Sequence, residues 1–157
     1  MTLTAIVLAL GIGFVAGLRS LTAPAMVAWA AYLGWIHLQD SPLAFMGSKW
    51  AVGIFTILAV GELVADQLPK TPPRTAPPGL IARIVLGGLS GASLVVAAGA
   101  SIWLGAVIGI VGGLIGTFGG YQARTGLVRA LHVPDLAIAF PEDIVAIGLG
   151  LFLVSRF

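Results

Sequence analysis

Two carboxylates in one apolar segment are the first residues that could do chemistry. Glu62 and Asp66 are four positions apart, so on a helix they lie on the same face. A charged side chain at membrane depth costs about 2.5 to 3.5 kcal/mol on insertion scales, and it therefore faces protein or water rather than lipid. Such a pair needs a cationic partner. For Asp66 the alternative is a position at the lipid headgroups.

Arg19 is the natural partner for these carboxylates. It lies with Ser20 and Thr22 just before Pro24, where we expect a helix to break because proline has no amide hydrogen to donate. An ion pair with the carboxylates would be structural. The functional alternative is that Arg19 and the free amides before Pro24 bind an anionic group, since a helix N-terminus favours negative charge. The structural version ranks first.

A second pair of carboxylates, Glu142 and Asp143, follows Pro141. We expect them to open the last helix and to cap its free amides, where the helix dipole stabilises negative charge. If they lie deeper, they could instead bind a cation or share a proton, because like charges raise the pKa of one of the two. The candidate substrate- or ion-binding residues are therefore Arg19, Ser20, Thr22, Glu62, Asp66, Glu142 and Asp143.

The chain offers little for catalysis. It has no cysteine, its two histidines, His37 and His132, lie in separate segments, and its serines lack a G-x-S-x-G context. Thiolate chemistry is excluded, and a zinc site or serine catalysis is unsupported. No phosphate-binding loop or dinucleotide fingerprint is present in the sequence either. We expect no enzyme activity, no metal and no cofactor.

The composition requires lipid around most of the surface. Hydrophobic residues make up 59% of the 157 residues and charged residues only 9%, whereas about a quarter of a soluble domain is charged. The mean hydropathy is +1.07. The formal charge of +2 comes from groups too few and scattered for a nucleic-acid surface. We expect an all-α, polytopic helix bundle, a single integral membrane domain over residues 1–157.

Two apolar stretches are too long to be single spans. Residues 3–36 would reach about 50 Å as one straight helix, against a hydrocarbon core of about 30 Å. We expect this stretch to break at 19–22, giving a broken or re-entrant first segment. It reads as a retained helix rather than a signal peptide, because no basic residue precedes Arg19. The second stretch, 80–121, must turn near 99–101.

Polar segments separate the remaining spans. Residues 37–49 read as a loop before a span over 50–68. Residues 122–141 are polar enough to lie at the interface, and 142–154 form the last span. The whole pattern predicts five to six membrane helices.

A proline-rich linker, 69–79, divides the chain into two nearly equal parts, 1–68 and 80–157. Short matches between the parts are equally compatible with a pseudo-repeat, as in many transporters, and with coincidence among small apolar residues. The matched segments are 17–20 with 88–91, and 51–67 with 106–122.

Two glycine stripes run along the second half. They comprise Gly105, Gly109 and Gly113, and Gly112, Gly116 and Gly120. Another helix can approach such a face closely, which is how helices associate in lipid. Packing inside the chain is the favoured interpretation. The alternative is contact between copies, and we expect a homo-oligomer because a few short helices barely enclose a pathway.

The basic loops give the orientation. Residues 69–83 and 122–130 are both basic and are separated by two spans, so they lie on the same side of the membrane. The positive-inside rule makes that side cytoplasmic. The side of the N-terminus depends on whether the first stretch crosses once or twice.

Several motifs occur together along the chain. They are GLRSLTAP at 17–24, DQLPKTP at 66–72, GGYQAR at 119–124, Pro134-Asp135 and Glu142-Asp143. In this combination the chain resembles, over nearly its whole length, the bacterial membrane proteins of domain of unknown function 4126. The resemblance implies a small polytopic fold in the bacterial inner membrane and brings no established activity.

Broken helices beside intramembrane charges favour a transporter or channel for a small ion or solute. In that function Arg19, Glu62 and Asp66 would line a polar site. The alternative is a non-catalytic scaffold or partner subunit, with a dry, closed interior, that packs through its glycine faces. A lipid-modifying enzyme using Glu142 and Asp143 ranks last, because the chain lacks a metal site or nucleophile for it.

Overall fold

A computed structural model describes residues 2–157, and every element within them is a helix. The elements are α1 (Leu3–Leu18), α2 (Thr22–Tyr32), the short 3-10 helix η1 (Ala44–Gly47), α3 (Lys49–Ala65), α4 (Pro77–Ala97), α5 (Ile102–Leu131) and α6 (Asp135–Val154). Within this part of the chain α4, α5 and α6 are long and apolar enough to cross a membrane, and α1 is apolar but shorter. The all-α prediction is confirmed, and the apolar helices indicate a membrane-embedded protein.

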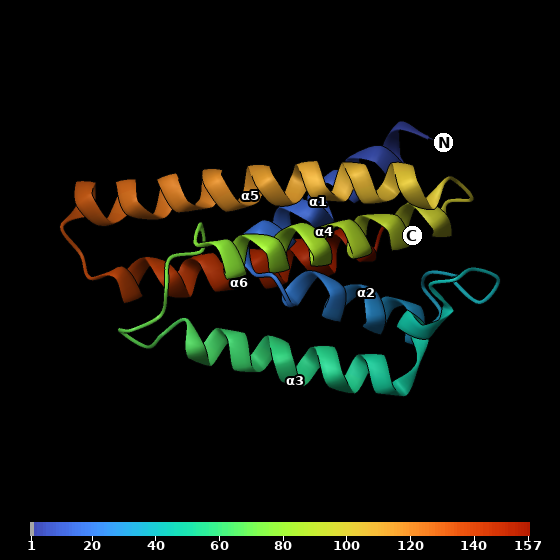
Figure 1. The fold of residues 1–157 in the computed structure, drawn as a ribbon, viewed down its shortest axis with the longest axis horizontal. Helices are drawn as coiled ribbons and strands as arrows, with labels where there is room; N and C mark the ends of the chain where they lie inside the picture. Colours follow the sequence, from blue (N-terminus) through green and yellow to red (C-terminus); the bar gives the residue numbers. More distant parts are fainter. Residues whose placement is uncertain (1) are drawn as a thin grey trace.

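The first apolar stretch folds into a helical hairpin. α1 and α2 run in opposite directions, and Figure 1 shows their turn well short of the end where α5 joins α6. The chain is extended at Arg19, with φ −140° and ψ 107°. Pro24 lies in the first turn of α2, where a missing amide hydrogen costs nothing. The predicted break at 19–22 is therefore confirmed, and we call residues 19–21 the hairpin tip.

α1, α4 and α5 pack through bare backbone. A Cβ added to Gly13 of α1 would collide with the backbone of Gly109, and one added to Gly109 would collide with Gly87 of α4. Between α4 and α5, a Cβ on Gly91 would lie 2.6 Å from the carbonyl oxygen of Gly105. We call these five residues the glycine core. Both predicted stripes thus serve mainly to pack α5 against α1 and α4.

The hairpin also contributes to a conventional apolar core. Ile12 and Val15 of α1 and Val27 of α2 are fully buried, together with Ala146 of α6. α3 lies at the edge of the bundle and packs mainly against α2 and η1 (Figure 1). Its outer face exposes apolar side chains such as Ile57, as a lipid-facing helix would.

Two segment predictions are wrong. Residues 122–141 are not distinct from the spans, because α5 continues to Leu131 and α6 begins at Asp135, with a left-handed residue, His132, at the end of α5. Their position at the membrane interface stays a prediction. Pro141 lies inside α6 and does not start it. The pseudo-repeat is not confirmed either: residues 17–20 lie at a helix break, whereas 88–91 lie within α4.

Candidate functional site

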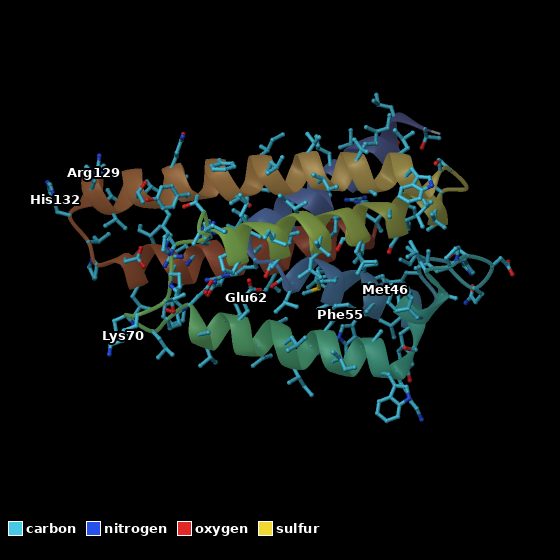
Figure 2. All side chains as sticks on the ribbon, viewed as in Figure 1. Met46, Phe55, Glu62, Lys70, Arg129 and His132 are labelled. Carbon is cyan, nitrogen blue, oxygen red and sulfur yellow. The ribbon has the colours of Figure 1, made fainter. Side chains whose placement is uncertain are left out.

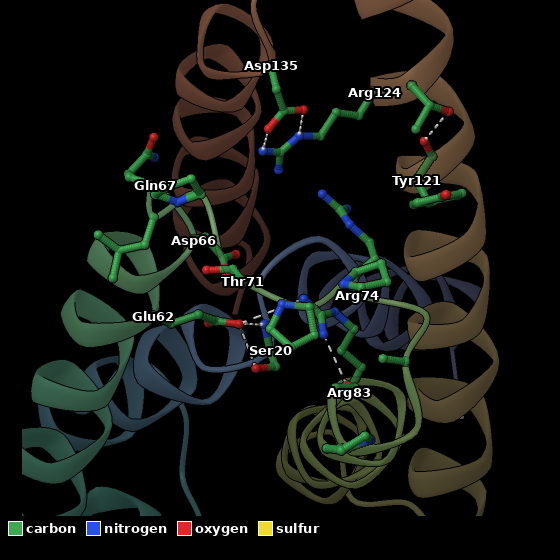
Figure 3. A pocket seen from close by; sticks show the side chains of 18 of the residues that line it. Ser20, Glu62, Asp66, Gln67, Thr71, Arg74, Arg83, Tyr121, Arg124 and Asp135 are labelled. Atoms are coloured by element: carbon green, nitrogen blue, oxygen red, sulfur yellow. Dashed lines mark hydrogen bonds and ion pairs between the residues drawn. The ribbon is translucent and has the colours of Figure 1, made fainter.

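A polar cavity lies beyond the hairpin tip. α1 ends and α2 begins at the tip, while α3 and α6 continue past it, and the linker between α3 and α4 lines one side of the space (Figure 3). The cavity has a volume of about 640 Å³. Its lining includes Ser20 of the tip and both signs of charge. The charged lining residues are Glu62, Asp66, Arg74, Arg83, Arg124 and Asp135.

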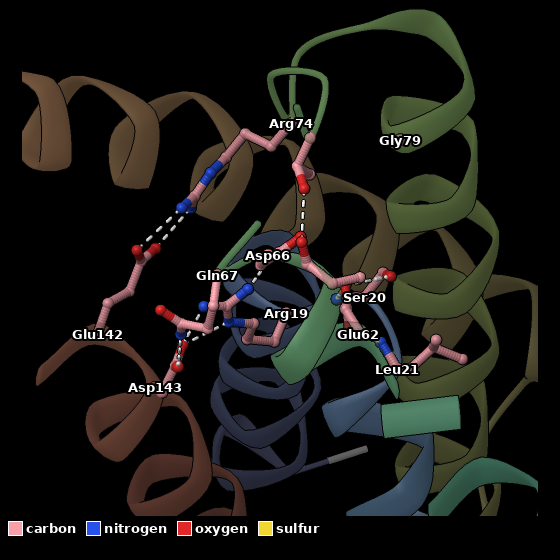
Figure 4. A network of polar contacts seen from close by, with 12 residues as sticks. Arg19, Ser20, Leu21, Glu62, Asp66, Gln67, Arg74, Gly79, Glu142 and Asp143 are labelled. Atoms are coloured by element: carbon pink, nitrogen blue, oxygen red, sulfur yellow. Dashed lines mark hydrogen bonds and ion pairs between the residues drawn. The ribbon is translucent and has the colours of Figure 1, made fainter. Parts of the chain in front are cut away.

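Arg19 precedes the lining residue Ser20, is fully buried and does not itself line the cavity; we call it the floor of the site. One of its terminal nitrogens pairs with Asp66 at the end of α3, and the other pairs with Asp143 of α6. Its Nε also donates to Asp143, at 2.6 Å, and the second oxygen of Asp143 accepts from Gln67, at 3.2 Å (Figure 4). One guanidinium thus joins the tip to α3 and α6. A charge this deeply buried requires such partners.

Glu62 has a different role from the one expected. Its carboxylate accepts hydrogen bonds from Ser20 N at 2.8 Å, Ser20 Oγ at 2.7 Å and Leu21 N at 2.9 Å (Figure 4). These groups precede α2, whose first amides have no partner within the helix. The anionic group at the predicted anion site is therefore the chain's own Glu62, and Arg19 pairs with Asp66 instead. Thr22 is buried, and it does not line the cavity.

Arg83 complements the other side of the break. Its Nε donates to the carbonyl of Gly17 at 3.1 Å, and its Nη1 donates to the carbonyl of Gly79 at 3.0 Å. Its Nη2 lies 4.0 Å from Glu62 Oε1. A cation is thus placed at the C-terminal end of α1 and an anion at the N-terminal end of α2. Both match the partial charges of the helix ends.

The capping prediction for Glu142 and Asp143 is wrong. α6 begins two turns earlier, at Asp135, because the residues before Pro141, 136–140, are apolar and continue the helix pattern of the last span. Glu142 instead pairs with Arg74, at 2.6 and 2.9 Å, and accepts from Arg124 at 3.3 Å. Arg124 also pairs with Asp135 through two bonds of 2.9 and 2.5 Å. Glu142 thus connects α6 to the linker through Arg74 and to α5 through Arg124, and Asp143 connects α6 to the hairpin tip through Arg19.

These pairs lie near one another in three groups, and we call the three groups together the polar network. Five of the six acidic residues of the chain belong to it, together with four arginines. Its members are Arg19, Glu62, Asp66, Arg74, Arg83, Arg124, Asp135, Glu142 and Asp143.

A family model matches a range that contains every residue of the polar network. The model, described as a domain of unknown function (DUF4126), covers residues 6–155. The chain belongs to the DUF4126 family. The family resemblance found in the motifs is thereby confirmed. No curated protein and no solved structure matches the chain.

Some network residues of this DUF4126 protein escaped the sequence analysis. Arg74 and Arg83 were interpreted only as basic charges of the loop 69–83 that orient the protein in the membrane. Both are buried, at 9% and 6% exposure. Arg124 and Gln67 fall within the family motifs GGYQAR and DQLPKTP. The useful signal was charge balance, since a buried carboxylate in lipid needs a guanidinium and few are available.

The DUF4126 cavity is lined by charges of both signs. Three carboxylates and three guanidiniums line a cavity large enough for a small polar molecule. Each lining carboxylate has a partner within the described residues, so none is left as a free base. The lining can therefore exchange its own ion pairs for those of a solute.

Proposed function

We propose that this DUF4126 protein is a transporter or channel for a small ion or polar solute, and that the cavity beyond the hairpin tip is its binding site. What supports this is a cavity of about 640 Å³, lined by charges of both signs, at the tip of a broken helical hairpin in a membrane protein. Broken helices beside buried charges are the usual plan of transporter binding sites. The proposed binding residues are the charged residues that line the cavity, and the other members of the polar network, Arg19, Glu142 and Asp143, hold them in place.

In the described conformation the path from the cavity, past the tip and between α1 and α2 toward the other end of the bundle, is closed. Ile12, Val15 and Val27 fill the space between the hairpin helices, and the glycine core seals α1 against α5. Passage of a solute requires the tip to move relative to α3 and α6, which Arg19 now joins through Asp66 and Asp143. Breaking and reforming these pairs is the proposed gating step.

We propose that the cavity opens to the cytoplasm. Lys70 and Arg129 lie at the cavity end of the bundle (Figure 2), and Arg74 and Arg124 belong to the network there. Positive charge favours the cytoplasmic side. In a bacterial cell this places the protein in the inner membrane, with loops 69–83 and 122–130 inside. Because α1 begins at the opposite end, the N-terminus lies outside.

The test is flux through the purified chain in liposomes, measured with a panel of protons, alkali cations, halides and small organic acids. We expect Arg83→Gln to reduce flux of the transported species roughly tenfold or more, because one lost charge-assisted bond is worth about that factor. Lys70→Gln is the matched control, since Lys70 is an exposed charge beside the cavity that joins no pair among the described residues. It should leave flux unchanged.

Circular dichroism and gel filtration establish that both variants fold. If no species of the panel crosses, or if folded Arg83→Gln transports like the wild type, the proposed site is wrong.

The scaffold alternative has less support. It relied on glycine faces free to bind a partner, and α1 and α4 cover those faces within the chain. We retain the proposal of a homo-oligomer, which has to use other faces of the bundle.

A further inference from the structure

The carboxylate of Glu62 sits where several donors converge. Ser20 N, Ser20 Oγ and Leu21 N surround it at 2.7 to 2.9 Å, with one oxygen bound by Ser20 and the other by Leu21. These are short, charge-assisted hydrogen bonds at the positive end of α2. We call these three donors, together with Arg83 Nη2, the carboxylate seat. The seat matches a planar group with two oxygens.

Arg83 gives the seat an unused donor. The residue is 6% exposed, lines the cavity, and donates its other nitrogens to backbone carbonyls. Its Nη2 donates no hydrogen bond among the described residues and stays 4.0 Å from Glu62 Oε1. An N–H···O⁻ bond would be about 2.7 to 2.9 Å. Glu62 therefore leaves part of this buried cation unpaired, and Figure 3 shows the two side chains approaching from different helices.

Glu62 and the seat belong to different parts of the bundle. The donors come from the tip between α1 and α2 and from α4, which the glycine core holds together. Glu62 comes from α3 at the edge, packed mainly against α2 and η1. Its side chain lines the cavity, so a solute there meets it directly. The contacts that hold α1, α4 and α5 together do not involve Glu62.

We propose that the seat is the solute-binding site and that its ligand is a small carboxylate anion, which binds by displacing Glu62. The entering group takes over the bonds from Ser20 and Leu21 and also reaches Arg83. A halide offers one centre and cannot bridge donors that bind separate oxygens. The proposal rests on the proposed function only in holding that the bound carboxylate is also the transported solute.

The test removes the internal competitor. The full chain carrying Glu62→Ala is purified in detergent, and its melting temperature is followed by the fluorescence of its four tryptophans while sodium formate or acetate is added. We expect a saturable rise, because a ligand that binds the folded state stabilises it. The wild type should need roughly ten- to a hundredfold more formate, since Glu62 already makes these bonds.

Two controls separate the seat from general salt effects. Adding Arg83→Gln to Glu62→Ala should abolish the rise, and Asp40→Ala, which removes an exposed carboxylate outside the network, should respond like the wild type. The proposal is wrong if Glu62→Ala gains no more than the wild type, if chloride works as well as formate, or if Arg83→Gln has no effect. If Glu62→Ala folds only with formate present, that supports the proposal, and Glu62→Gln is then titrated with the same expectations.

Uptake of labelled formate and acetate into liposomes distinguishes this inference from the proposed function. If formate and acetate bind but are not taken up, the carboxylate seat is supported and the transport of these anions is contradicted. If another solute is taken up and no carboxylate binds, the transport function is supported and the carboxylate seat is contradicted.

Discussion

The glycine core and the polar network solve the same problem in opposite ways. In lipid no hydrophobic force draws helices together, so contacts must come from close packing or from polar bonds. The glycine core uses absent side chains, and its backbones meet in one arrangement only. The polar network uses long arginine side chains that reach carboxylates on other elements, and Arg19, Arg124 and Glu142 each contact two partners. The first region is held by backbone contacts, and the second by side chains that have more than one charged neighbour.

The largest effect we expect comes from breaking the floor of the network. Arg19→Ala leaves Asp66 and Asp143 without their shared cation, and removing one member of a buried ion pair costs about 3 to 5 kcal/mol. The free energy of unfolding is measured by denaturant titration in mixed micelles. Arg129→Ala, which removes a charge at the exposed end of α5, is the control. A loss below about 1 kcal/mol for Arg19→Ala would mean that the network tolerates an unpaired carboxylate, as a wet site does.

A smaller loss is expected from one methyl group in the glycine core. Gly109→Ala places a Cβ against the backbone of Gly87, which cannot move aside as a flexible side chain would. Overpacking of this kind costs about 1 to 3 kcal/mol. Gly53→Ala on α3 is the matched control, because no atom lies within 4 Å of its added Cβ. It should be neutral or stabilise by up to about 1 kcal/mol through helix propensity. Equal effects at both positions would remove the distinction between a packed and an open glycine.

The two regions also differ in how far the sequence could predict them. The break near Pro24, the turn near 99–101 and the stripe that contains Gly109 could be predicted from the sequence, since each depends on neighbours along the chain. The network depends on which helix ends meet in space. Arg83 was therefore missed and Glu62 was given the wrong partner. Pro141 was taken for a helix start because proline favours the first turn, yet α6 accommodates it further in.

The smallest effect is expected at Asp135, which we call the rim of the polar network. It tests whether the exposure of the network to water increases from Arg19 to Asp135. The side chain of Asp135 is 65% exposed while that of its partner Arg124 is 15% exposed, so water and salt reach this pair. Asp135→Asn should cost less than about 1 kcal/mol, as exposed ion pairs do. Repeating the unfolding titration in about 1 M salt, where the screening length falls to about 3 Å, should erase that cost. The cost of Arg19→Ala should persist in the same salt, because Arg19 is fully buried and its partners Asp66 and Asp143 are only 20% and 12% exposed, so ions screen these pairs far less than the pair at Asp135. If both costs vanish together, water reaches the floor as freely as the rim, and the gate proposed at Arg19 is open rather than closed.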